Sequence, residues 1–167
     1  MISSIRIDDR LIHGQVALVW SKELGTKHIV VANDDAAVND VTKMTLQMAT
    51  PAGIKLLIKP VAESIKVFND PRAKDLGMFV LTNNVHDALE IVKSCPGLVG
   101  SVNVANVGRF DESDPTLKTQ LNPYIILNPR ELADLRELVD QDVPVYSQVI
   151  PTNPKTSISS LLAEVGE

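Results

Sequence analysis

Near its amino end the chain carries a run of side chains that can bind and transfer an anion, Asp8-Asp9-Arg10-Leu11-Ile12-His13-Gly14-Gln15. We predict that His13 lies where a strand-end loop meets the start of a helix. The free N–H groups of a helix start favour an anion, and the Arg10 guanidinium can bind the same group. Gly14 has no Cβ to obstruct a ligand. We expect three of the neighbours to contact phosphate or a partner protein, namely Asp9, Gly14 and Gln15.

An imidazole in these surroundings can accept a phosphoryl group. Neutral imidazole attacks phosphorus and holds the group as phosphohistidine, a transfer that requires only positioning and charge stabilisation. Either Asp8 or Asp9 can fix the ring tautomer through the nitrogen that does not react. An ordinary histidine pKa near 6.5 leaves the ring mostly neutral at cytoplasmic pH. A histidine at a helix start can also simply hydrogen-bond a loop, so the spacing alone leaves a structural role for His13 open.

Other predicted strand ends are polar as well, and open parallel sheets bind ligands at that edge. The residues there that can contact phosphate or a partner, or equally cap a loop, are Asn33, Asp34, Asn103, Asn106, Gly108 and Arg109. His28 is expected at the amino end of a strand and His86 in the first turn of a helix, so neither is assigned a catalytic role. The sequence has one cysteine, no HExxH, no GxGxxG and no GxxxxGK[ST], so we predict neither a metal site nor a nucleotide cofactor.

Short β-branched runs alternate with stretches of helical periodicity along the chain. The predicted strands are residues 2–7, 28–32, 54–58, 78–81, 98–104, 124–127 and 143–149. The predicted helices are residues 14–24, 38–49, 61–68, 84–93, one that starts at Asn128-Pro129-Arg130-Glu131, and 157–165. Strands separated by helices of about ten residues predict right-handed βαβ units. The fold class is therefore α/β, with an open, mostly parallel sheet of about seven strands and helices on both faces.

The predicted helix 38–49 has Val41, Met44, Thr45 and Met48 at i, i+3, i+4 and i+7, the spacing of an amphipathic helix. Residues 105–121 are predicted to form a long loop that holds Gly108, beside the carboxyl edge of the sheet.

Composition limits the classes of protein that fit. The chain has 167 residues, 21 acidic and 16 basic side chains and a formal net charge of −5, which predicts one globular domain, 1–167. It has no apolar run of roughly 18 residues and no secretory pattern near Met1, so we expect a cytoplasmic protein. Scattered basic residues and few aromatic ones argue against nucleic acid as a partner.

The segment IRIDDRLIHGQVALVW resembles the active-site signature of the IIB subunits of the mannose/fructose/sorbose family of the bacterial phosphoenolpyruvate:sugar phosphotransferase system. Four further segments are similar to the family: VVANDDAAVNDVTKMTLQMATPAGIKLLI, LTNNVHDALEIV, SVNVANVGR and VPVYSQVIPT. The similarity therefore extends along essentially the whole chain. In one place the chain departs, because Arg109 stands where many members have a second glycine.

The resemblance implies a phosphotransferase of sugar transport that works without a cofactor. His13 would accept phosphate, on its δ nitrogen, from the phosphohistidine of a IIA subunit or domain. It would pass the phosphate to a sugar carried by the membrane subunits IIC and IID, at which the protein would be peripherally associated. Arg10 would stabilise the phosphoryl group and Asp8 would orient the site. Mannose, fructose, sorbose or an amino sugar such as N-acetylgalactosamine are all open as substrates, and so is homo-oligomerisation.

Two other classes of protein fit parts of the pattern. A receiver-like regulatory domain would share the fold and the acidic pair Asp8 and Asp9, but it needs an acceptor aspartate after the third strand, where Ile58-Lys59-Pro60 stands. A non-catalytic interaction subunit would use His13 only to anchor its loop. The chemical stability of the bound phosphate and a His13→Ala variant separate these alternatives.

Overall fold

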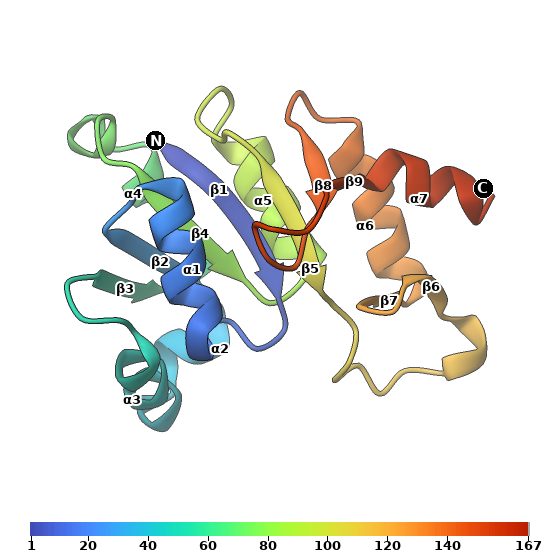
Figure 1. The fold of residues 1–167 in the computed structure, drawn as a ribbon, viewed down its shortest axis with the longest axis horizontal. Coiled ribbons are helices and arrows are strands. Elements are labelled where there is room, and N and C mark those ends of the chain that lie inside the picture. Colours follow the sequence, from blue (N-terminus) through green and yellow to red (C-terminus); the bar gives the residue numbers. More distant parts are fainter. Residues whose placement is uncertain (167) are drawn as a thin grey trace.

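The computed structural model describes residues 1–166, apart from the side chains of Gly14 and Gln15. Its centre is a seven-stranded sheet in the order β3-β2-β4-β1-β5-β8-β9 (Figure 1). The strands of this sheet are β1 (Ile2–Asp8), β2 (His28–Ala32), β3 (Lys55–Lys59), β4 (Met78–Thr82), β5 (Val102–Asn106), β8 (Val145–Ser147) and β9 (Thr156–Ser157). The helices are α1 (Gly14–Leu24), α2 (Asp34–Val38), α3 (Asp40–Ala49), α4 (Val61–Phe68), α5 (Val85–Ser94), α6 (Pro129–Val139) and α7 (Ile158–Glu164).

Neighbouring strands of the sheet run parallel, except that β8 and β9 are antiparallel. The central strands β2, β4 and β5 are rich in β-branched and other apolar residues and are buried almost throughout. Continuous burial of this kind requires cover on both faces of the sheet. The predicted α/β class, with a mostly parallel sheet, is confirmed.

Two apolar clusters show which helices cover which face. Trp20 of α1 and Leu46 of α3 pack with strand residues such as Ile29 in one cluster. Phe68 of α4 and Leu89 of α5 belong to the other. The chain thus leaves β1 toward one face and leaves β4, the neighbour of β1 in the sheet, toward the opposite face. The carboxyl end of β1 is therefore a topological switch point, where open α/β sheets form their ligand crevice.

Asparagine side chains begin several of the helices. Asn33, Asn39, Asn84 and Asn128 each accept a hydrogen bond from the backbone N–H three residues on, the usual arrangement of an N-cap. The predicted helix start at Asn128 is confirmed. The predicted helix 38–49 is wrong at its beginning, because Asn39 ends α2 and caps α3.

The region after β5 differs most from the prediction. The predicted sixth strand, 124–127, lies outside the main sheet: β7 (Ile125–Leu127) pairs antiparallel with β6 (Thr119–Asn122), which falls at the end of the predicted loop 105–121. A two-residue turn joins the two strands, so a local hairpin forms in place of a crossover. The seventh strand of the main sheet is instead the short β9 of the tail.

The helix α3 faces the opposite way from what its apolar spacing suggests. Leu46 is only 4% exposed and packs in the α1 cluster, whereas Val41, Met44 and Met48 are 76%, 62% and 80% exposed. At 100° per residue, these three occupy an arc of about 60° roughly opposite Leu46. The apolar side of α3 is therefore turned to solvent. No helix among residues 1–166 is long and apolar enough to cross a membrane.

Candidate functional site

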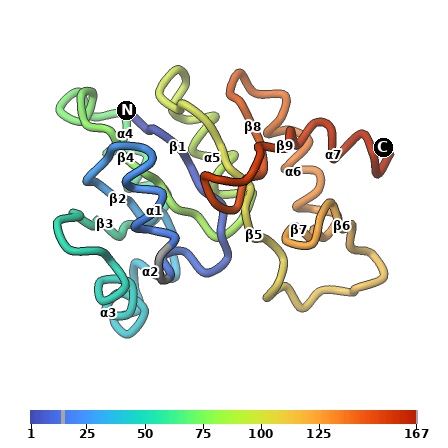
Figure 2. The backbone as a smooth tube through the Cα atoms, in the orientation of Figure 1, coloured from blue at the N-terminus to red at the C-terminus, as the bar shows by residue number. Residues whose placement is uncertain are grey.

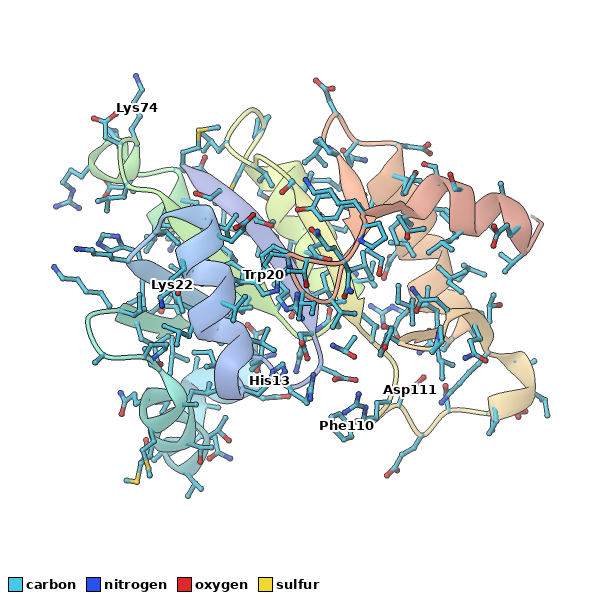
Figure 3. All side chains as sticks on the ribbon, in the orientation of Figure 1. His13, Trp20, Lys22, Lys74, Phe110 and Asp111 are labelled. Carbon is cyan, nitrogen blue, oxygen red and sulfur yellow. The ribbon has the colours of Figure 1, made fainter. Side chains whose placement is uncertain are left out.

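A tight turn at the end of β1 presents His13 at the mouth of the crevice. The Leu11 N–H donates to the Asp8 carbonyl at 2.9 Å, which reverses the chain directly after the strand. Leu11 has φ = 58°, a left-handed conformation that costs a branched residue about 1–2 kcal/mol. Strain of this kind is concentrated at functional sites. Figure 3 shows His13 beside the start of α1, at the lower end of the sheet in this view.

The buried carboxylate of Asp8 connects the parts of the site. Its Oδ1 accepts the Arg10 backbone N–H at 3.0 Å and lies 3.5 Å from Arg10 Nε. Its Oδ2 accepts a hydrogen bond from Asn106 Nδ2 at 3.2 Å and one from Arg6 Nη2 at 3.4 Å. A buried carboxylate requires such partners, since desolvation of an unpaired charge is costly. Asp8 is thus fixed in place as an anion beneath the loop.

Arg6 supplies a second charge behind Asp8. Its guanidinium is buried, lies 5.5 Å from the centroid of the Trp20 ring, and donates to the Gln148 carbonyl at 3.4 Å. Burial lowers the pKa of Arg6, while the charge of Asp8 acts against that shift. Trp20 in turn donates from Nε1 to the Val149 carbonyl at 3.0 Å. The pair Arg6 and Asp8 therefore links β1 to α1 and to the segment after β8.

His13 lies above this pair and is partly open to solvent. Its side chain is 22% exposed, and its Nδ1 lies 3.8 Å from Asp8 Oδ2. Burial lowers the pKa of His13, the nearby Asp8 carboxylate raises it, and burial is the larger effect. The ring is consequently neutral at neutral pH, which is the state that a nucleophile requires. Nδ1 is buried and has no partner within hydrogen-bonding distance among the described residues.

The start of α1 leaves donors for an anion. His13 occupies the N-cap position, its side chain makes no capping hydrogen bond, and the first turn contains no acidic residue. Uncapped first-turn N–H groups and the helix dipole attract negative charge. The predicted contacts of Gly14 and Gln15 lie outside the residues whose side chains the structure describes.

Asp9 joins the loop after β5 to the site. Its Oδ2 accepts the Arg109 N–H at 3.2 Å, and burial raises the pKa of Asp9. Gly108 has φ = +95°, and a Cβ there would lie 1.7 Å from the Ile126 carbonyl oxygen. Glycine is required at that position because the chain passes so close to β7. Arg109 is exposed beside it, at the edge of the crevice.

Three further predicted contacts have structural partners instead. The buried Asn103 donates from Nδ2 to the Gln148 carbonyl at 2.8 Å and accepts the Gln148 N–H at 3.0 Å. Asn33 caps α2, as described above. Asp34 accepts the Val61 N–H at 2.9 Å, which ties α2 to α4. We therefore assign Asn33, Asp34 and Asn103 to the scaffold rather than to phosphate.

The sequence interpretation missed Arg6, and it named Asn106 only as a polar residue at a strand end, without its contact to Asp8. A signal was present, because residues two apart in a strand share a face and opposite charges on a buried strand must pair. Arg6 and Asp8 satisfy that rule in β1. Asn106 is the neighbour of Asp8 in the β1–β5 register, and this contact could be found only from strand pairing. His28 lies at the amino end of β2, as predicted, and His86 is half-exposed, 3.3 Å from Asp134.

The described residues offer no metal site. Among residues 1–166, no group of three or more histidine, cysteine, aspartate or glutamate side chains is arranged to hold a metal ion.

Comparison with known proteins identifies the family of the chain. Residues 2–167 match the family described as PTS system sorbose subfamily IIB component. The chain belongs to this family. Its members are phosphotransferases of sugar transport, and this chain is one of their IIB phosphotransfer components. A similar protein is the probable phosphotransferase enzyme IIB component of Streptococcus pyogenes, which is 55% identical over 97% of this chain and 99% of that protein.

Two further similarities concern the fold and the domain arrangement. The crystal structure of the IIBSor domain of the sorbose permease from Klebsiella pneumoniae superimposes with a TM-score of 0.89 and 30% identity, over 99% of this chain and 98% of that one. The mannose-specific EIIAB component of Escherichia coli is 28% identical over 99% of this chain, which spans 49% of that protein.

Proposed function

We propose that His13 carries a phosphoryl group between two proteins of a sugar phosphotransferase system. The donor is the phosphohistidine of a IIA protein, and the final acceptor is a sugar held by the membrane subunits IIC and IID. The observation that carries the proposal is the neutral, partly exposed imidazole held beside the buried Asp8, with Arg10 next to it at the switch point of the sheet. The EIIAB relative supports a IIA partner, since its name joins both parts in one component.

The transfer needs no redox partner and no metal. A ring nitrogen of His13 attacks phosphorus with its lone pair, and the bond between phosphorus and the donor nitrogen breaks, returning that electron pair to the donor imidazole. In the second step a sugar hydroxyl oxygen attacks phosphorus and gives its proton to solvent, and the bond between phosphorus and the His13 nitrogen breaks, returning that electron pair to the His13 ring. Arg10 and the first-turn N–H groups of α1 compensate the charge of the phosphoryl oxygens in both steps.

The ring orientation bears on which nitrogen reacts. Nδ1 faces Asp8 in this structure, so the opposite ring edge carries Nε2 toward the mouth. Phosphate on Nδ1, which the resemblance implies, requires the ring to make a half-turn about the Cβ–Cγ bond. A phosphoryl group on Nδ1 would then point toward solvent and the partner protein, and the Asp8 carboxylate would lie on the opposite side of the ring. Two-dimensional ¹H–³¹P correlation of the phosphorylated protein identifies the nitrogen.

The remaining parts of the proposal follow the same chemistry. The chain contacts phosphate and partner surfaces, so we assign sugar selection mainly to the membrane subunits. The sugar is one of the mannose-family class, which includes sorbose and amino sugars such as N-acetylgalactosamine. The protein then works in the cytoplasm, docked at intervals to the permease.

The test is phosphorylation by a phosphorylated IIA protein. Wild type should gain phosphate that survives alkali and is lost in acid, as a phosphohistidine does, and His13→Ala should gain none. His86→Ala is the matched control and should behave as wild type, because His86 lies on α5 beside Asp134, and α5 packs on the opposite face of the sheet from α1. Alkali-labile phosphate would indicate the receiver-like alternative. Full complex activity in His13→Ala would indicate the interaction subunit.

A further inference from the structure

An exposed apolar strip lies beside the proposed phosphoryl site. It consists of Val38, Val41, Met44 and Met48, which are between 62% and 80% exposed. Large apolar side chains grouped on one helix face are unusual on a soluble protein and mark interaction surfaces. Val41, Met44 and Met48 form the outer side of α3, whose inner side is fixed by Leu46, and Val38 is the last residue of α2. The exposure of the strip follows from the orientation of α3 about its own axis. A half-turn of the helix would bury Val41, Met44 and Met48 and expose Leu46.

The helices α2 and α3, which carry the strip, follow β2 at the edge of the sheet where β1 ends. Their inner residues Ala36 and Leu46 pack in the same apolar cluster as Leu11 and Ile12, the residues directly before His13. Figure 2 shows α3 below and to the left of α1, with the loop after β5 to the right. A protein whose reactive group reaches His13 can thus cover the strip at the same time.

The size and composition of the strip fit a partner that binds transiently. Four side chains expose a few hundred Å², below the roughly 800 Å² that each partner buries in a standard stable complex. A permanent partner here, such as a second copy of this chain, would also obstruct the mouth. Methionine is flexible and polarisable, and it suits surfaces that bind more than one shape. The end of the strip that holds Val38 is acidic, because Asp34, Asp35 and Asp40 are exposed on either side of Val38 in the chain.

We propose that this strip is the docking surface for the IIA phosphoryl donor, which would offer an apolar patch with a basic rim. The inference rests on the function proposed above and adds to it the surface by which the donor is recognised. The place of the strip favours the donor over the membrane subunits as occupant, because α2 and α3 follow β2 at the sheet edge where β1 ends, and exposed Asp34, Asp35 and Asp40 complement a basic rim.

Methyl labelling of methionine tests the contact without any phosphate. The chain has four methionines, and two of them, Met44 and Met48, lie in the strip. Met78 is buried at the start of β4, and Met1 lies at the amino edge of the sheet, so both serve as internal controls. Addition of unphosphorylated IIA should shift the Met44 and Met48 methyl signals and leave the other two unchanged. Shifts of all four, or of none, would contradict the proposal.

A kinetic experiment tests whether the contact serves transfer. The triple variant Val41→Asn, Met44→Gln, Met48→Gln should raise the KM for phosphorylated IIA about tenfold and leave the plateau rate of His13 phosphorylation unchanged, since the strip does not touch the reacting atoms. Leu76→Gln is the matched control: it replaces an exposed apolar residue just before β4, and both parameters should equal those of wild type.

Two results would overturn the proposal by assigning the strip to another occupant, and a third would separate the docking contact from the proposed function. An unchanged KM together with slower transfer to the sugar would assign the strip to the membrane subunits. An unchanged KM together with loss of a dimer in light scattering would assign it to a second copy of the chain. If wild type gains no phosphate at His13 but the methyl shifts occur, the proposed function fails while the docking contact stands.

Discussion

The strands β1 and β2 end at the same edge of the sheet. The burial of charged and apolar side chains is nevertheless opposite at the end of β1 and in the helices after β2. At the end of β1, charged groups are buried: Asp8 and Arg6 lie in the strand beneath the loop and form an ion pair. After β2, apolar groups are exposed along α3. Each arrangement reverses the ordinary rule of apolar inside and charged outside, and each carries a cost in stability. Buried charges fix a reacting group, whereas exposed apolar groups serve partners that must leave again.

The largest effect should come from removing the buried cation. Arg6→Met removes the buried charged partner of Asp8 and leaves only the part-exposed Arg10 beside it, so the free energy of unfolding should fall by about 3 kcal/mol in urea denaturation. Adding Asp8→Asn to that variant removes the Asp8 charge and should restore part of the loss. If the double variant is less stable than Arg6→Met alone, the two charges do not act as a pair.

Substitutions on the two sides of α3 should differ sharply in their effect on the free energy of unfolding. Leu46→Ala should reduce the free energy of unfolding by about 2–4 kcal/mol because it leaves a cavity against the β1 loop. Met48→Ala, on the exposed side, should change it by no more than about 0.5 kcal/mol. Equal costs in thermal or urea unfolding would mean that α3 is turned differently in solution.

Arg10 should matter for rate more than for folding. Arg10→Lys keeps the charge but loses the planar fork, so phosphoryl transfer should slow about tenfold, which corresponds to about 1.4 kcal/mol in the barrier. The dissociation constant for unphosphorylated IIA should stay the same, because Arg10 acts on the phosphoryl group. Rapid-quench kinetics and calorimetry separate these two quantities, and equal turnover would contradict the placement of Arg10.

The smallest effect concerns the protonation of His13. Because burial lowers the pKa of His13 in the folded protein, its NMR titration should fall below the ordinary value near 6.5 and return to it when the chain is unfolded in urea. Phosphate acceptance should therefore persist as the pH falls to 6.5 and be lost only below that, as the ring becomes protonated. A folded-state pKa above the unfolded one would show that Asp8, and not burial, dominates.

Much of the site could be predicted from residues close in sequence. The order Asp8, Arg10, His13 at a strand end defines the catalytic loop without any tertiary information. The network behind it could not be predicted, since Asn106 meets Asp8 only through the pairing of β1 with β5, and Gln148 meets Arg6 across 142 residues.

The errors in the fold have a similar origin. Helical periodicity shows that α3 has an apolar side, but not whether the core or solvent receives it, and the single residue Leu46 decides the question. The strand Ile125–Leu127 has the composition of a strand of the main sheet. It pairs instead with Thr119–Asn122, the strand directly before it in the chain, and the two form a hairpin. Local pattern gives the elements, while tertiary contacts give their orientation and partners.

Phosphopeptide mapping tests the central claim most directly. After incubation with phosphorylated IIA at alkaline quench, mass spectrometry should place one phosphoryl group on the peptide that contains His13, with fragment ions assigning it to that residue. Phosphate on His28, on His86 or on an aspartate of the β1 loop, with residue 13 unmodified, would contradict the account.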